Sequence, residues 1–166
     1  MLGETANNFP LVSVLVPAYN AQSFLDEAIQ SVLKQTYSNF ELLIVDDCSQ
    51  DATYEIAQKW ALLDRRVQVI QNPKNLGIAG NRNRALGLAK GKYIAWQDAD
   101  DISLPERLAL QTRFLEDHPQ MGIVGGGLEL FTDNRVLGYR HYPQSDHLIR
   151  RYIFRYSPIT QPAAMI

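Results

Sequence analysis

The 166-residue sequence contains a single cysteine, Cys48, and no long apolar run. One cysteine excludes an intramolecular disulfide and is typical of a reducing compartment. A membrane-spanning helix needs roughly 20 apolar residues, which no segment supplies. The opening residues, MLGETANNFP, have neither the basic start nor the apolar centre of a secretory signal. We therefore expect a cytoplasmic protein of one domain, because a single domain spans about 100–200 residues.

The glycine-rich loops that bind phosphate groups are also missing. No G-x-G-x-x-G follows the first apolar run, and G-x-x-x-x-G-K-[ST] occurs nowhere in the chain. The sequence therefore disfavours a Rossmann dehydrogenase and a P-loop NTPase. Pro17, Ala18, Tyr19 and Asn20 follow the first run instead. Tyr19 is either a stacking partner for a nucleobase or a packing residue, and the residues alone favour packing.

The formal net charge is only −2, from 16 basic and 18 acidic side chains, which disfavours a nucleic-acid-binding protein. This charge is unevenly distributed. Residues 135–166 hold five arginines and one acid, Asp146, a net charge of +4. The other 11 basic and 17 acidic side chains give residues 1–134 a net charge of −6. The acidic part and the basic end are therefore interpreted separately.

Arginines alternate with tyrosines between Tyr139 and Tyr156 in the basic end. The pattern favours an amphipathic helix that packs Leu148, Tyr152 and Ile153 on the sheet and leaves its arginines solvated. A surface that faces anionic lipid is the second interpretation, and single-stranded nucleic acid is the least supported. We therefore expect no nucleic-acid partner, with a peripheral membrane contact as the alternative to simple packing.

Apolar runs alternate four times with stretches of helical periodicity, which predicts an α/β fold with a parallel sheet covered by helices. Beyond them, the pattern predicts strands over Met121–Val124 and Leu128–Phe131 and a short helix over Ser145–Phe154. The four predicted strands are Leu11–Val16, Phe40–Val45, Val67–Ile70 and Lys92–Gln97, and the four predicted helices cover residues 22–35, 51–63, 78–89 and 103–118.

Local signals predict where several of these elements begin and end. Pro17 ends the first strand, and Asp51 is the expected N-cap of the second helix. Gly91 is expected at the C′ position after the third helix. Ser103 and Glu106 have the spacing of a capping box at the start of the fourth helix.

Two groups of aspartates follow predicted strands. Asp46 and Asp47 follow the second strand, and Asp98, Asp100 and Asp101 follow the fourth. Because the carboxyl ends of parallel strands meet at one edge of the sheet, we expect these side chains to lie there. Crowded carboxylates favour a hard divalent cation such as Mg2+ or Mn2+. The residues alone support equally the alternative that these acids cap helices or stay solvated.

Other interpretations of these charges remain open. Arg82 and Arg84 open the third predicted helix near Lys74, which suits either an anion site or a solvated basic face. Clustered acids also suit a Mg2+-dependent phosphotransferase or phosphohydrolase with an aspartyl nucleophile. That chemistry needs a lysine at a later strand end, and none is placed there. A non-catalytic domain that binds a nucleotide-sugar is a further alternative.

Four segments, in order and at ordinary spacing, resemble family 2 glycosyltransferases with the GT-A fold. The resemblance runs from about Val12 to Phe131 and weakly on to Met165. It implies one catalytic domain over residues 1–166 with a Rossmann-like, mostly parallel sheet covered by helices on both faces. The segments are VSVLVPAYN, AIQSVLKQTYSNFELLIVDDCSQDAT, NPKNLGIAGNRNRALGLAKGKYIAWQDADD and HPQMGIVGG.

The resemblance also implies roles for individual residues. Asp47 matches the aspartate that reads the nucleotide base, and Arg82 matches a basic residue near the nucleotide. Asp98 and Asp100 match the D-x-D pair, with Asp100 as the more direct metal ligand and Asp98 also toward the ribose and phosphates. Asp101 matches an acid that touches the sugar. The implied nucleotide-sugar-binding residues are Pro17, Ala18, Tyr19, Asp47, Arg82, Asp98, Ala99 and Asp101.

The implied reaction moves a sugar from a nucleoside diphosphate, most commonly UDP, to an acceptor hydroxyl with inversion. Mg2+ or Mn2+ would stabilise the departing diphosphate. The implied acceptor is a saccharide or a lipid-linked saccharide, in polysaccharide or lipopolysaccharide assembly. The implied location is cytoplasmic, at or near the inner face of the membrane.

The catalytic base of such enzymes lies in an acidic motif after the segment that SPITQPAAMI resembles. No acid follows Asp146 in this sequence, so no residue is assigned as the base. We expect the base beyond Ile166, and residues 1–166 to be the nucleotide-binding part of a longer enzyme with an incomplete acceptor half. The missing base also favours the non-catalytic alternative.

Overall fold

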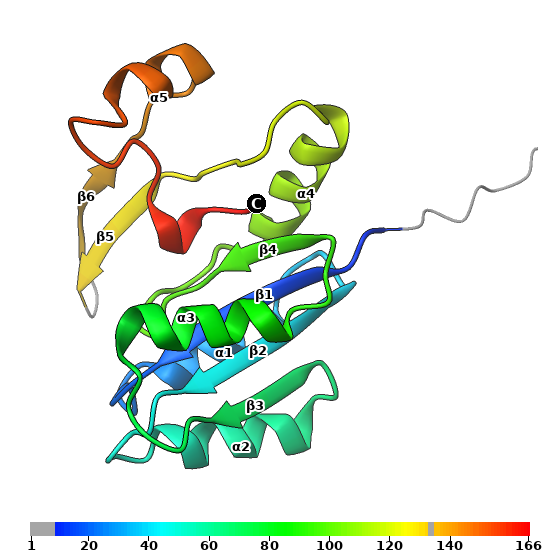
Figure 1. The fold of residues 1–166 in the computed structure, drawn as a ribbon, viewed down its shortest axis with the longest axis vertical. Coiled ribbons are helices and arrows are strands. Elements are labelled where there is room, and N and C mark those ends of the chain that lie inside the picture. Colours follow the sequence, from blue (N-terminus) through cyan, green and yellow to red (C-terminus); the bar gives the residue numbers. More distant parts are fainter. Residues whose placement is uncertain (1–8, 133–134) are drawn as a thin grey trace, which may run out of the picture.

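The computed structural model describes residues 9–132 and 135–166. Four parallel strands form one sheet in the order β3-β2-β1-β4, and β5 and β6 form a separate antiparallel pair (Figure 1). No helix among the described residues is long and apolar enough to cross a membrane. The elements are β1 (Val12–Ala18), α1 (Leu25–Leu33), β2 (Phe40–Asp46), α2 (Thr53–Leu63), β3 (Val67–Gln71), α3 (Gly77–Leu88), β4 (Tyr93–Trp96), α4 (Arg107–Asp117), β5 (Leu128–Thr132), β6 (Arg135–Arg140), α5 (Asp146–Tyr152) and the 3-10 turn η1 (Gln161–Ala163).

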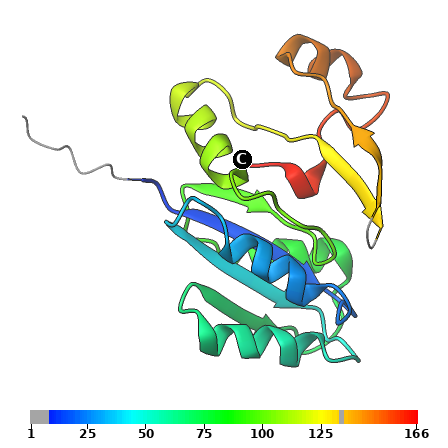
Figure 2. The same cartoon turned by 180° about the vertical axis from the view of Figure 1, so that it is seen from behind.

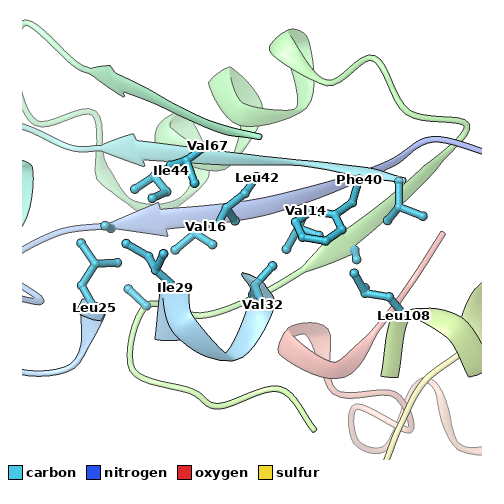
Figure 3. Close-up of a cluster of buried hydrophobic side chains, with 14 of the residues drawn as sticks. Val14, Val16, Leu25, Ile29, Val32, Phe40, Leu42, Ile44, Val67 and Leu108 are labelled. Atoms are coloured by element: carbon cyan, nitrogen blue, oxygen red, sulfur yellow. The ribbon is translucent and has the colours of Figure 1, made fainter. Parts of the chain in front are cut away.

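Helices cover both faces of the sheet, as the alternation predicts. Helices α1 and α2 lie on one face and α3 lies on the other (Figures 1 and 2). The larger core joins Ile29 and Val32 of α1 to alternate residues of the strands, including Val14, Val16 and Leu42 (Figure 3). The intervening strand residues point the opposite way, because successive side chains of a strand alternate between its faces. Those residues form a second cluster of Leu15, Leu43, Val45, Ala85 and Trp96.

The first strand continues through Pro17 to Ala18, so the prediction that the proline ends it is wrong. β1 pairs with β4 only as far as Leu15 opposite Trp96. Its pairing with β2 continues to Ala18 opposite Asp46. At Pro17 one side of the strand is no longer paired with β4, and the missing N–H of a proline can be tolerated there.

The C-terminal segment adds an antiparallel edge to the sheet. Met165 lies between Ala95 of β4 and Val124, and it forms a bridge with each. The predicted strand over 121–124 is therefore reduced to a single bridge at Val124. The strand-like character of the segment 164–166 comes from its backbone pairing with Ile94 and Trp96.

The β5–β6 hairpin and α5 stand apart from the parallel sheet (Figures 1 and 2). The sequence pattern predicts β5 but misses β6. The short helix occurs as predicted, but no residue of α5 is buried, so the predicted packing of its apolar side on the sheet is wrong. Leu148 and Ile153 remain 37% and 56% exposed. In Figure 1 the helix lies beyond the hairpin, apart from the parallel sheet.

Three of the predicted helix signals act differently in the structure. Helix α4 begins at Arg107, and its N-cap residue, Glu106, makes no capping hydrogen bond with its side chain. The Ser103 hydroxyl donates to Gln97 instead of capping the helix. Helix α3 ends with Ala89 in an extended conformation, so Gly91 is not its C′ residue. Asp51 is not the N-cap of α2, which is Ala52. The Asp51 side chain nevertheless accepts a hydrogen bond from the N–H of Thr53, the first residue of the helix.

Gly91 is required by a close backbone approach. Its N–H donates to the Ser13 hydroxyl at 2.8 Å, and a Cβ there would lie 2.5 Å from the Ser13 nitrogen and 2.8 Å from the Leu11 oxygen. Neither backbone atom can move without disturbing β1. The position therefore selects glycine for space and not for a left-handed conformation.

We expect Gly91→Ala to lower the free energy of unfolding by about 1–3 kcal/mol, as overpacking does. The matched control is Gly87→Ala in α3, where a Cβ meets nothing within 4 Å. That change should be neutral or stabilising by up to about 1 kcal/mol, because alanine favours helix. Urea denaturation of both variants measures the difference, and equal stabilities would contradict the close-approach explanation.

Candidate functional site

A pocket of about 490 Å3 opens at the carboxyl ends of the parallel strands. Since β2 and β4 flank β1 in a parallel sheet, the loops that follow these three strands meet at one edge. The pocket also takes in the start of α3. This is the edge at which ligands bind in open α/β sheets.

Eight of the nine sequence-predicted site residues line this pocket. They are Pro17, Ala18, Tyr19, Asp47, Arg82, Asp98, Ala99 and Asp100. Asp101 is the exception, and Asp46 also lies outside the pocket, buried and bonded to Ser49 and Gln71. The other lining residues are not predicted from the sequence, because they come together only through the path of the chain between β1 and α1 and at the start of α3. They are Asn20, Ala21, Phe24, Asn75, Gly77, Ile78 and Asn81.

Asp47 is buried and joins β2 to the start of α3. One carboxylate oxygen accepts from the Asn72 side-chain amide at 2.6 Å and from the Leu76 N–H at 2.8 Å. The other accepts from the Gly77 N–H at 2.9 Å. The free N–H groups at a helix start favour such a carboxylate. Asp47 is therefore both a helix-capping residue and part of the pocket wall.

A buried amide network supports Asp47 from behind. The side-chain nitrogen of Asn72 also donates to Asn81, and Asn81 donates to the Val45 carbonyl at 2.9 Å. Both asparagines are almost completely buried, and the Asn72 side-chain oxygen has no partner among the described residues. The network holds the end of β2 against α3, so the pocket wall is preformed.

The loops after β1 and β2 are joined by hydrogen bonds. The Asn20 N–H donates to the Ser49 hydroxyl at 2.9 Å, and the Gln50 N–H donates to the Asn20 side chain at 2.9 Å. Asn20 and Cys48 both have left-handed backbones, with φ of 48° and 62°. Two non-glycine residues in this region mark a tightly constrained loop pair beside Tyr19 and Asp47.

Arg82 of α3 reaches across the pocket to Asp98. Its guanidinium lies 3.2 Å from the Asp98 carboxylate and 5.8 Å from the centre of the Trp96 ring. Its Nε is buried and has no partner among the described residues. A guanidinium held over an aromatic ring with an unused donor is well suited to a phosphate or carboxylate.

Three aspartates crowd the loop after β4. Asp100 is exposed, and Asp101 is half-buried, with its N–H donating to the Asp98 carbonyl at 3.2 Å. Burial, followed by the charges of Asp98 and Asp100, raises the pKa of the Asp101 carboxyl, and Arg107 opposes this. The carboxylates of this loop therefore repel one another, and a bound cation would reduce that repulsion.

The acidic loop fits a cation that takes few protein ligands. Within residues 9–132 and 135–166, no three histidine, cysteine or acidic side chains converge as a metal cage. Mg2+ and Mn2+ do not need one, because one or two carboxylates and substrate phosphate oxygens complete their shell. Asp100 and Asp98, both facing the pocket, supply this kind of oxygen donor.

The comparisons with known proteins agree with this geometry. The family model described as "Glycosyl transferase family 2" matches residues 13–164. The uncharacterized glycosyltransferase MJ1057 of Methanocaldococcus jannaschii is 33% identical in an alignment of 170 positions that covers 100% of this chain and 58% of that protein. The Escherichia coli UDP-Glc:alpha-D-GlcNAc-diphosphoundecaprenol beta-1,3-glucosyltransferase WfgD is 37% identical over 134 residues, 81% of this chain and 52% of that protein.

A solved structure shares the fold. The mannosyltransferase PcManGT of Pyrobaculum calidifontis, in complex with GDP-Man and Mn2+, superposes with a TM-score of 0.66 at 28% identity. The match covers 72% of this chain and 36% of that one. The chain spans about half the length of the curated relatives that it matches.

We expect Asp47→Asn to destabilise the fold by about 1–3 kcal/mol, because an amide nitrogen would replace one carboxylate oxygen and could not accept from the N–H groups that this oxygen faces. Chemical denaturation of the wild type and of Asp47→Asn measures this difference in the free energy of unfolding. The control is Asp117→Asn in α4, an exposed partner of Arg113, where the change should stay within about 0.5 kcal/mol. Equal effects at the two positions would rule out the capping role of Asp47.

Proposed function

Because the chain belongs to glycosyl transferase family 2 and has the GT-A fold, we propose that its pocket binds the nucleoside diphosphate of a sugar donor. UDP is the proposed nucleotide, and the sugar is transferred with inversion to an acceptor hydroxyl. The observation that carries this proposal is that Tyr19 and Asp47, expected beside the base, line one pocket together with Asp98 and Asp100 of the acidic loop. A relative, WfgD, is named for a UDP-sugar donor.

The nucleoside is proposed to occupy the side of the pocket formed by the loops after β1 and β2. Tyr19 is 50% exposed there, which leaves a ring face free to stack on a base. Asp47 lies on the same wall, and its bonds to the start of α3 fix the carboxylate in place. Pro17 and Ala18 complete this side of the pocket.

The diphosphate is proposed to lie toward Arg82 and the acidic loop. Arg82 neutralises phosphate charge through its guanidinium, and Asp100 and Asp98 hold Mg2+ or Mn2+. A divalent ion bound there stabilises charge on the departing diphosphate as a Lewis acid. Ala99 and Asp101 are the loop residues proposed to lie near the sugar. The Mn2+ in the PcManGT complex supports a divalent ion of this type.

Residues 1–166 are proposed to be the nucleotide-binding part of one catalytic domain, with the catalytic base outside them. Among these residues no acid follows Asp146. The coverage of about half of each relative is consistent with this division. A non-catalytic nucleotide-sugar-binding domain is the second candidate, since binding needs no base. Binding of UDP and Mn2+ without sugar transfer, both by residues 1–166 and by a longer chain, would favour this second candidate.

The acceptor is proposed to be a saccharide on a lipid carrier, approached at the inner face of the membrane, with cell-surface polysaccharide as the product. WfgD is named for an acceptor on diphosphoundecaprenol. In this chain the hairpin and the residues that follow α5 expose large apolar side chains, among them Leu137 at 61%, Tyr139 at 63% and Phe154 at 97%. Exposed arginines lie among them, which suits an anionic lipid surface.

UDP binding should depend on a divalent ion in the wild-type chain. Asp100→Ala should remove that dependence while leaving weak, metal-independent binding, because the base-side residues remain intact. Calorimetry with UDP, with and without Mn2+, measures both quantities. The expected loss is about 10-fold or more in affinity with Mn2+ present, as for the loss of a group that orients or binds a metal.

The matched control for this measurement is Asp117→Ala, which removes an exposed aspartate away from the pocket. Its UDP affinity should equal that of the wild type at every Mn2+ concentration. Identical weak binding in wild type and Asp100→Ala would refute the metal role of the acidic loop. Binding of a phosphate analogue at Asp98 without any nucleotide binding would favour a phosphotransferase instead.

Binding to vesicles that contain phosphatidylglycerol should weaken on charge reversal in the basic end. The test variant is Arg151→Glu with Arg155→Glu, and the expected loss is about tenfold or more, since each basic residue near an anionic surface contributes about 1 kcal/mol. The control reverses two exposed arginines elsewhere, Arg65 and Arg113. Co-sedimentation at low salt measures it, and no vesicle binding by the wild type would dismiss the membrane contact.

A further inference from the structure

Gln97 lies under the acidic loop, in the position directly after β4. The residue is only 1% exposed, although glutamine is polar and seldom fully buried. It does not line the pocket. A buried amide of this kind must have its hydrogen bonds satisfied, so its partners show what it is for.

The amide nitrogen of Gln97 binds both ends of the acidic loop. It donates to the Asp98 carbonyl at 3.1 Å and to the Asp101 carbonyl at 2.7 Å. These two bonds close the four-residue segment that carries all three aspartates. The Gln97 side chain therefore holds the main chain of the loop and leaves the three carboxylates free of this contact.

Two donors determine which way the Gln97 amide faces. The Arg107 guanidinium donates to its oxygen at 3.1 Å, and the Ser103 hydroxyl donates to the same oxygen at 2.5 Å. A guanidinium has no acceptor, so only the amide oxygen can face it. The amide nitrogen is consequently directed at the two loop carbonyls.

Arg107 is itself held by neutral groups. It donates to the Trp96 carbonyl at 2.6 Å, to the Gln111 side-chain oxygen at 3.2 Å and to the Ala164 carbonyl at 3.4 Å. Burial lowers its pKa to about 10, and the charges of Asp101 and Asp98 oppose that shift. The guanidinium stays charged near neutral pH and offsets part of the repulsion between the loop carboxylates.

We propose that Gln97, oriented by Arg107 and Ser103, is a positioning residue that shapes the acidic loop for its divalent ion. This inference rests on the proposed function, because it assigns a supporting group to the metal site proposed there. Groups that orient metal ligands indirectly change metal affinity by about 10–100-fold when they are lost. Gln97 acts through the backbone of the loop and touches neither nucleotide nor metal.

Gln97→Glu tests this with little change of shape. A carboxylate still accepts from Arg107 and Ser103, but it has no proton for the two loop carbonyls. Gln111→Glu is the matched control. Gln111 also accepts from Arg107 and donates to a carbonyl, that of Ala163 at 2.8 Å, which belongs to the C-terminal segment and not to the acidic loop. Both variants add one negative charge beside the same arginine.

The readout is the ratio of UDP affinities with and without Mn2+, measured by calorimetry on variants whose circular dichroism shows a folded chain. We expect Gln97→Glu to lower this ratio by about tenfold or more, and Gln111→Glu to leave it at the wild-type value. Gln97→Met, which is neutral and has no hydrogen-bond donor, should lower the ratio as Gln97→Glu does. If the glutamate variant does not fold, the methionine variant is the one that tests the inference.

Two results would overturn the inference. One is a wild-type ratio in a folded Gln97 variant, and the other is an equal loss in Gln111→Glu, which would mean that added charge beside Arg107 is the cause. Neither would affect the proposed function. A wild-type chain whose UDP affinity does not depend on Mn2+ is a separate outcome, because it refutes the proposed metal site itself and the role of Gln97 with it.

Discussion

The site depends on the parallel pairing of β1 with β2 on one side and β4 on the other. This pairing brings residues that are about 30 and 80 positions apart in the chain, such as Tyr19, Asp47 and Asp98, to one edge of the sheet. The register is held by buried apolar residues on both faces, and a slip by one residue would turn them out of the core. The packing of the core therefore fixes the strand register, and the register in turn fixes the geometry of the pocket.

Buried polar side chains connect the ends of the strands to the residues around the pocket. Asp47 connects the end of β2 to the first turn of α3, and Gln97 connects the end of β4 to the acidic loop and α4. In both places a side chain satisfies backbone groups that the end of an element leaves free. The pocket residues are thus positioned by hydrogen bonds from the regular elements, which suits a site that must hold charged groups close together.

The features that the sequence predicts incorrectly are those that depend on distant partners. Ser103 and Glu106 have the spacing of a capping box, but Ser103 hydrogen-bonds to Gln97 instead. Gly91 resembles a helix terminator, yet its role is to make room for β1. The apolar side of α5 suggests core packing, yet no residue of the helix is buried, and the helix lies beyond the hairpin (Figure 1). In each case the local pattern is present, and the position of the segment in the tertiary structure decides what it does.

The sequence alone determines the α/β class, the order of the four parallel strands along the chain and most residues of the pocket. The class and the strand order follow from the periodicity of apolar residues, which is a local property, and the pocket residues follow from the resemblance of short segments to a known family. Tertiary structure decides that Asp46 turns into the interior while Asp47 lines the pocket, and that Met165 adds a strand edge beside β4. It also decides that Gln97 reaches both ends of the acidic loop, because the orientation of that amide is set by Arg107 and Ser103, which lie further along the chain.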